Sequence, residues 1–251
     1  MAGHSKWANI KHRKGAQDAK RGKIFTRIIK EITIAVKESG NDPSSNPRLR
    51  NAISNAKGEN MPKDNIDRAI KKASGDDANT YSEVTFEGYA NGGVAVFVEC
   101  TTDNINRTVA DVRSIFNKNG GSLGKNGSLE FIFDRKGVFV IDTDKNSIDL
   151  EKVEMELIDS GLEESYIDEN TITLYTSFVD FGLMQNKLEE MNIEVKQSSL
   201  DRIPNTTTKL DLNEAKKVLN LINKFEDDND DVQNVFHNLE MTSEIEDYLN
   251  Q

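Results

Sequence analysis

The first long apolar stripe of the chain predicts a helix over residues 18–39. Since an α-helix turns by about 100° per residue, its large apolar side chains fall within one arc and four bases fall on the opposite arc. Arg21 and Ile34 depart from this pattern, and Gly40 suits the end of the helix. The apolar set is Phe25, Ile28, Ile29, Ile32, Ala35 and Val36, and the basic set is Lys20, Lys23, Arg27 and Lys30. The pattern predicts a helix that buries one side and presents a basic ridge on the other.

Two shorter amphipathic segments follow the first helix. Pro47 suits the first turn of a helix that Gly58 closes, and Pro62 opens another that Gly75 ends. Apolar residues recur every three or four positions in both segments, which is the helical period. Together with the first helix, these segments predict a small bundle at the start of the chain.

From Tyr81 the apolar period changes to two, which is typical of strands. Strands are predicted over 82–90 and 94–102, joined by a turn that contains Gly92 and Gly93. A helix is predicted over 103–121, and another strand over 128–133. This block has three predicted strands and one helix, so half of one face of its sheet lacks a cover.

A regular alternation begins near residue 138. Strands are predicted at 138–143, 164–168, 171–176 and 193–199, with helices at 148–161 and 179–192. The resulting order is β-α-β-β-α-β, the ferredoxin-like plan. This segment reads as a domain of its own.

A long helix over 212–227 and a strand over 232–241 follow Pro204, and they would complete the uncovered middle block. The predicted fold class is therefore α+β, with an N-terminal three-helix bundle and two α+β domains, one inserted in the other. The predicted domains are 1–76 (a basic arm and the bundle), 79–135 plus 204–241 (discontinuous), and 137–202 (the ferredoxin-like insertion). A short acidic tail is expected at the end.

Charge divides the chain sharply. Up to Gly75 there are 17 basic and 7 acidic residues, a balance of +10, whereas the remainder has 15 basic and 36 acidic residues, a balance of −21. Such an asymmetry points to a polyanionic partner for the basic part. Trp7 lies among the bases, where it could stack on a nucleobase or equally pack back on the bundle. The predicted nucleic-acid-binding residues are Lys6, Trp7, Lys11, Arg13, Lys14, Lys20, Arg21, Lys23, Arg27 and Lys30.

The chain contains short matches to catalytic and nucleotide-binding motifs, but each match lacks the neighbouring residues or elements that the motif requires. Residues 120–124 match the letters of G-x-S-x-G, but the predicted order there is helix, loop, strand, whereas a nucleophile elbow needs a strand before the serine and a helix after it. Gly124 and Lys125 lack the remaining residues of a P-loop. His4, His12, His237 and Cys100 are scattered, while zinc needs about four such ligands close together. We therefore expect a protein that is not an enzyme and that uses no metal and no cofactor.

The single cysteine, Cys100, cannot form an internal disulfide, and it lies in an apolar run typical of a buried strand. The basic N-terminus lacks the apolar stretch of a secretory signal, and the sequence has no apolar run near the ~20 residues that span a bilayer. These features predict a cytoplasmic protein with no membrane partner.

Several stretches resemble the YebC/PmpR family. They are GHSKWANIKHRKGAQDAKRGKIF, NPRLRNAISNAKGENMPKDNIDRAIKKASG, FEGYANGGVAVFVECTTDNINRTVADVRSIFNKNGGSLG and DDVQNVFHN. The resemblance extends over essentially the whole chain. The resemblance implies three domains and a DNA-binding regulator of transcription. It equally leaves open a translation factor that binds ribosomal RNA, because mitochondrial relatives activate translation and bacterial members have been linked to ribosomes stalled on proline-rich stretches. The partners expected are thus DNA or ribosomal RNA, with the ribosome as the alternative setting, and a protein partner on the acidic domains.

Overall fold

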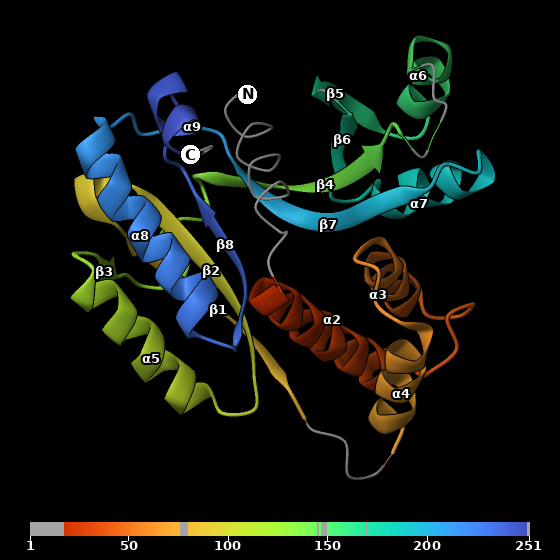
Figure 1. Cartoon of the computed structure of the whole chain (residues 1–251), viewed down its shortest axis with the longest axis horizontal. Helices are drawn as coiled ribbons and strands as arrows, with labels where there is room; N and C mark the ends of the chain where they lie inside the picture. Colours follow the sequence, from red (N-terminus) through yellow and green to blue (C-terminus); the bar gives the residue numbers. More distant parts are fainter. Residues whose placement is uncertain (1–17, 76–79, 145, 147–149, 169, 250–251) are drawn as a thin grey trace. The chain divides into compact units, whose positions relative to one another are not determined.

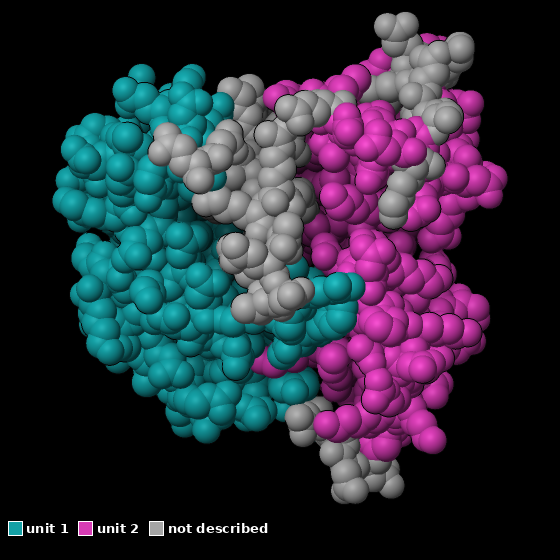
Figure 2. All heavy atoms as spheres, viewed as in Figure 1, with its two compact units in different colours: residues 1–27, 79–134, 203–251 teal, residues 28–78, 135–202 magenta. Residues whose placement is uncertain are grey.

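A computed structural model describes residues 18–75, 80–144, 146, 150–168 and 170–249. The chain divides into two compact units, residues 1–27, 79–134 and 203–251, and residues 28–78 and 135–202. Figures 1 and 2 show the elements and the two units, and each unit is described below by itself. Among the described residues, no helix is long and apolar enough to cross a membrane.

The first unit is built on a four-stranded sheet of order β3-β1-β2-β8. Neighbouring strands in it are antiparallel. Helices α5 and α8 contribute to one apolar core with this sheet, and the short helix α9 joins the same core through Ile245 and Leu249. The elements are β1 (Ser82–Tyr89), η1 (Asn91–Gly93), β2 (Ala95–Thr102), α5 (Ile105–Lys118), β3 (Ser122–Leu123), α8 (Leu212–Asp228), β8 (Val232–His237) and α9 (Ser243–Leu249).

Central strand β2 is buried on both faces. Val96, Val98 and Cys100 belong to the core beneath the helices, whereas the alternate residues Ala95 and Phe97 belong to a second cluster. That second cluster also contains Leu129, Phe133 and Phe236. Because successive side chains of a strand point to opposite faces, the second cluster covers the face of the sheet opposite the helices.

The predicted strand over 128–133 is wrong except for its last residue. The structure has turns there, and the short strand β3 lies earlier, at Ser122–Leu123. Leu129 is fully buried and Phe133 is 4 % exposed, because both pack on the far face of the sheet. The buried carboxylate of Glu87 holds this segment by accepting hydrogen bonds from the backbone N–H of Gly127 and of Leu129, both at 2.6 Å. Phe131, which lies between Leu129 and Phe133 in the alternating pattern, is 74 % exposed, so burial in this loop does not follow the period of a strand.

A buried polar cluster joins β2, α5 and β8 at one end of the sheet. Asp231 Oδ2 accepts hydrogen bonds from Thr102 Oγ1 at 3.0 Å, Thr108 Oγ1 at 2.8 Å and Arg107 Nη2 at 2.7 Å. Both threonines are fully buried. The hydrogen bond to Asp231, followed by the one to Asp103, raises the pKa of the Arg107 guanidinium, so this cation stays charged at every working pH.

The second unit contains three helices, which are α2 (Asp18–Ser39) from Ile28 onward, α3 (Pro47–Gly58) and α4 (Lys63–Ala73). Buried Asn46 fixes the connection from α2 to α3. Its Nδ2 donates to Ala35 O at 2.7 Å and to Gly40 O at 2.8 Å, and its Oδ1 accepts from Leu49 N at 2.9 Å as the N-cap of α3. One side chain thus satisfies the end of one helix and the start of the next.

A second four-stranded sheet, of order β5-β6-β4-β7, lies in the same unit. Its core contains Phe139, Leu174 and Met184 beneath helices α6 and α7. The elements are β4 (Phe133–Asp142), α6 (Leu150–Ile158), β5 (Leu162–Asp168), β6 (Thr171–Ser177), α7 (Phe181–Glu190) and β7 (Val195–Pro204). The predicted β-α-β-β-α-β order is therefore confirmed.

Helix α3 lies against β7, an edge strand of this sheet. Asn55 Nδ2 donates to Ser198 O at 2.7 Å, and Asn55 Oδ1 accepts from Ser198 N at 2.8 Å. Asn51 adds a hydrogen bond from the Ser198 hydroxyl. Gly58 permits the close approach, since a Cβ atom there would lie 1.8 Å from the backbone oxygen of Lys196.

The α+β fold class is confirmed, with a helical N-terminal part and two antiparallel sheets. The strand after Pro204 does return to the first sheet, where β8 pairs with β2. The expected acidic tail contains a helix, α9, for which the sequence analysis made no prediction. The boundaries of the three predicted domains stay a prediction.

Candidate nucleic-acid interface

The predicted basic residues begin before the part of the chain that the structure describes. Lys6, Trp7, Lys11, Arg13 and Lys14 lie outside the described residues, and the side chain of Lys20 is likewise not described. The remaining four, Arg21, Lys23, Arg27 and Lys30, are all carried by α2. The helix begins and ends at the residues predicted from its apolar period and from Gly40, which has a φ of +86°.

Arg21 is the most outward of these cations. Its residue is exposed, and its guanidinium carbon lies 5.5 Å from the centre of the Phe25 ring. A cation over an aromatic face is held weakly, by ~0.5–1 kcal/mol at exposed sites. Arg21 therefore presents its charge on the exposed side of the first turns of α2.

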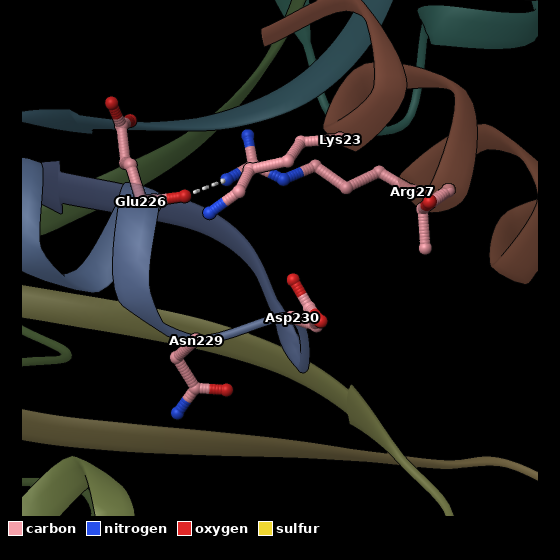
Figure 3. Close-up of a pocket in the computed structure, with 6 residues that line it drawn as sticks. Lys23, Arg27, Glu226, Asn229 and Asp230 are labelled. Atoms are coloured by element: carbon pink, nitrogen blue, oxygen red, sulfur yellow. Dashed lines mark hydrogen bonds between the residues drawn. The ribbon is translucent and has the colours of Figure 1, made fainter. Parts of the chain in front are cut away.

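Lys23 and Arg27 lie one helical turn apart and face the end of α8 (Figure 3). Arg27 Nη2 donates a hydrogen bond to the backbone oxygen of Glu226 at 3.2 Å. Glu226, Asn229 and Asp230 line the same small cavity. Its volume is about 10 Å³, which is room for about one water molecule, so this is a contact between two elements and has no space for a larger ligand.

The end of α8 explains why cations gather there. A helix C-terminus carries unpaired carbonyl groups and partial negative charge, and bases in the last turn normally offset it. Helix α8 has no basic residue in its last turn and instead ends in Glu226, Asp227 and Asp228. Lys23 and Arg27 supply the missing positive charge from another helix.

Lys30 differs from the other three cations. It is 7 % exposed, so the prediction that it lies on the solvent-facing ridge is wrong. All residues from Ile32 to Val36 are also buried, including Ile34, which the apolar pattern had set apart. The middle of α2 is therefore enclosed, whereas Lys37 in its last turn is exposed. The exposed bases of α2 lie in its first turns and at its end.

The first unit also brings together bases that sequence reasoning did not connect. Lys118 from the end of α5 and Lys216 and Lys217 from the start of α8 line one open hollow, together with three asparagines. The pair Lys216–Lys217 was visible in the sequence, but it lies inside an acidic part of the chain and 98 positions after Lys118. Nothing local in the sequence links these positions.

Two family models together match almost the whole chain. One is described as the TACO1/YebC protein N-terminal domain and matches residues 5–76. The other is described as the TACO1/YebC second and third domain and matches residues 81–239.

Close relatives are similar over their full length. A "Probable transcriptional regulatory protein" of Amoebophilus asiaticus is 53 % identical over 246 residues, covering 97 % of this chain and 100 % of the relative. One of the same name from Geobacillus kaustophilus is 48 % identical, covering 96 % of this chain and 98 % of the relative. The crystal structure of a conserved hypothetical protein of Aquifex aeolicus matches with a TM-score of 0.81 at 39 % identity, covering 91 % of this chain and 93 % of that one.

Proposed function

Because the chain belongs to the YebC/TACO1 family, whose close relatives bear the name of regulators, we propose that it is a nucleic-acid-binding regulator that acts on transcription by binding DNA. The observation that carries this proposal is the charge division between +10 up to Gly75 and −21 afterwards. Phosphates are neutralised by Lys and Arg, and this sequence-independent term supplies much of the affinity for nucleic acid. The names of the relatives support a regulatory role.

In this proposal the arm before α2 and the first turns of α2 bind the phosphate backbone. Exposed Arg21 extends the basic surface of the arm onto the helix. Lys23 and Arg27 are partly neutralised by the end of α8, so an incoming phosphate competes with that contact. Binding is then expected to be moderate and strongly salt-dependent.

The acidic domains have a different role in the proposal. Their net negative charge repels nucleic acid, so they act as a scaffold and as a surface for a protein partner. No covalent step is assigned to any side chain, and the protein is proposed to work in the cytoplasm as a regulator, not an enzyme.

The test compares two charge-matched variants of the full chain. In the arm variant, Lys6, Lys11, Arg13 and Lys14 become Gln; in the control, four exposed bases of α4 become Gln, namely Lys63, Arg68, Lys71 and Lys72. On duplex DNA the arm variant should bind more weakly, and its plot of log K against log salt should be less steep by about 3 to 4, since each phosphate contact contributes ~0.9. The α4 control should keep most of the wild-type slope.

An arm variant with the wild-type slope would contradict the proposal, as would equal losses in both variants. The nucleic acid recovered with the purified protein separates the two settings. Recovered DNA supports the transcriptional role, whereas ribosomal RNA would assign the protein to the ribosome.

A further inference from the structure

An open hollow lies in the first unit, between η1, the end of α5 and the start of α8. Its volume is about 470 Å³, within the size range of small-ligand sites. Its polar lining consists of Asn91, Lys118, Asn119, Lys216, Lys217 and Asn220. We call it the lysine–asparagine hollow.

Local geometry brings these side chains together. Gly120, with a φ of +76°, ends α5 and lets the chain turn beside η1, where a Cβ atom at Gly120 would lie 3.6 Å from Asn91 Oδ1. The carboxylate of Glu214 accepts from Asn91 Nδ2 at 2.9 Å and from Lys217 Nζ at 3.0 Å. Asn220 Nδ2 donates to Asn119 Oδ1 at 3.2 Å, which ties α8 to the end of α5. The lining is therefore held in place by hydrogen bonds of its own.

The hollow gathers positive charge in a part of the chain that has little of it. Segments 79–134 and 203–251 contain eight Lys and Arg against 18 Asp and Glu, yet three of the eight line this hollow. Lys217 pairs with Glu214, but both side chains are exposed (59 % and 37 %), so a phosphate can displace this weak ion pair. Lys118 is exposed and makes no ion pair with a residue that the structure describes, so it is available to an anion.

An aromatic ring lies next to Lys216, outside the lining of the hollow itself. Lys216 Nζ lies 4.4 Å from the centre of the Tyr248 ring, and Tyr248 on α9 is 40 % exposed. Exposed aromatic rings beside Lys and Arg are the usual platform for an unpaired base, while the cations hold its phosphates. Asparagine amides supply both a donor and an acceptor for the edge of a base.

We propose that the lysine–asparagine hollow binds a short single-stranded segment of nucleic acid, with its phosphates on Lys118 and Lys217 and a base near Tyr248 and the asparagines. The proposal rests on the proposed function, and it adds a second contact far along the chain from the arm. A single strand fits better than a duplex, because stacking on Tyr248 and hydrogen bonds from amides both require an unstacked base with open edges. A free phosphate would use the lysines but would leave the ring and the asparagines without a role.

The experiment measures binding of the full chain to fluorescein-labelled single strands of about 20 nucleotides, as RNA and as DNA, over a range of salt. The hollow variant is K118Q/K217Q. Its control is R113Q/K224Q, which removes the same charge from exposed positions elsewhere on the same two helices. A third variant, Tyr248→Leu, keeps every charge and removes the ring.

The hollow variant should flatten the salt slope by about 1.4, because each of two phosphates contributes ~0.7 on single strands, and it should weaken binding roughly 10- to 30-fold at about 0.1 M salt. Tyr248→Leu should weaken binding by about 5- to 100-fold at an unchanged salt slope, since stacking is not a charge effect. The control should change affinity much less than the hollow variant does.

Three results would overturn the inference while leaving the arm proposal intact. The first is equal behaviour of the hollow variant and its control, with binding still lost in the arm variant. The second is full affinity in Tyr248→Leu. The third is binding of inorganic phosphate or a nucleoside monophosphate that K118Q/K217Q abolishes, with strand affinity unchanged, which would make the hollow a small-anion site. Conversely, loss of strand binding in the hollow variant alone, with the arm variant unaffected, would support the hollow and refute the arm.

Discussion

Replacing Asp231 with Ala should destabilise the first unit by about 1–3 kcal/mol. The side chain accepts hydrogen bonds from Thr102, Thr108 and Arg107 through a single oxygen atom. Its backbone N–H and C=O also bond, to Asn229 and Thr101, and those bonds survive the substitution. The change in stability therefore measures the side-chain hydrogen bonds of Asp231 and not its backbone hydrogen bonds.

The size of this loss in stability depends on which hydrogen-bond donors of the cluster can find another acceptor when Asp231 is removed. Fully buried Thr102 donates its hydroxyl to Asp231, and an unsatisfied buried donor costs ~1–3 kcal/mol. Thr108 can donate instead to Asn104 O, 3.1 Å away, so its loss is small. The side chain of Arg107 is 48 % exposed, so solvent screens its ion pair with Asp231 and the loss of that pair adds little. Asp231→Asn keeps an acceptor oxygen and should cost only about 1 kcal/mol.

Urea unfolding of the full chain, followed by circular dichroism and by protection of backbone amides in β2 and β8, measures the effect. Asp227→Ala is the control, because Asp227 is exposed at the end of α8 and should change stability by less than ~0.5 kcal/mol. If Asp231→Ala and Asp227→Ala lower the free energy of unfolding equally, the buried cluster does not stabilise the junction and this reasoning is refuted.

Two further predictions concern glycine spacing and the acidic end of α8. Gly58→Ala should lower the free energy of unfolding by more than ~2 kcal/mol, since its Cβ would lie 1.8 Å from Lys196 O. Gly22→Ala in α2, where a Cβ would have nothing within 4 Å, should raise the free energy of unfolding by ~0.5–1 kcal/mol. Thermal melts in which Gly58→Ala is the more stable of the two variants would contradict this. Neutralising Glu226, Asp227, Asp228 and Asp230 as Gln or Asn should strengthen binding to duplex DNA at fixed salt by removing the competitor of Lys23 and Arg27; unchanged affinity would show that the α8 end does not compete. Asp231 is left out of that variant because it is buried and structural.

Much of the fold could be predicted because local rules agreed with the tertiary structure. The ends of α2 and α3 followed from Gly40, Pro47 and Gly58, and the ferredoxin-like order followed from the change of apolar period. The prediction failed at 128–133, which is a packed loop that Glu87 holds in place. Leu129 and Phe133 are buried there, but Phe131 is 74 % exposed. Apolar residues at every second position therefore do not by themselves show that all of them share a buried face.

Helix α9 was missed for a related reason. Its seven residues offer only Ile245 and Leu249 as buried apolar positions, and three acids dominate its composition. A helix this short is stabilised mainly by packing, which local sequence does not report. The sequence could not predict that Lys118 and Lys217 line one hollow, or that Arg27 contacts Glu226, because these residues are far apart in the chain. The charge division predicted a basic region, but it could not show that the end of α8 lies against two of its bases, Lys23 and Arg27.

The two hydrogen bonds between the Asn55 side chain and the Ser198 backbone have a consequence for solubility. An edge strand exposes free N–H and C=O groups on which the strand of another molecule can add, and this is a common route to aggregation. In β7 both backbone groups of Ser198 are taken by one side chain of α3, so a foreign strand arriving there finds no continuous ladder to extend. Removing that amide, as in Asn55→Ala, would reopen the strand to self-assembly, so the helical segment protects its neighbour from polymerisation as well as packing against it.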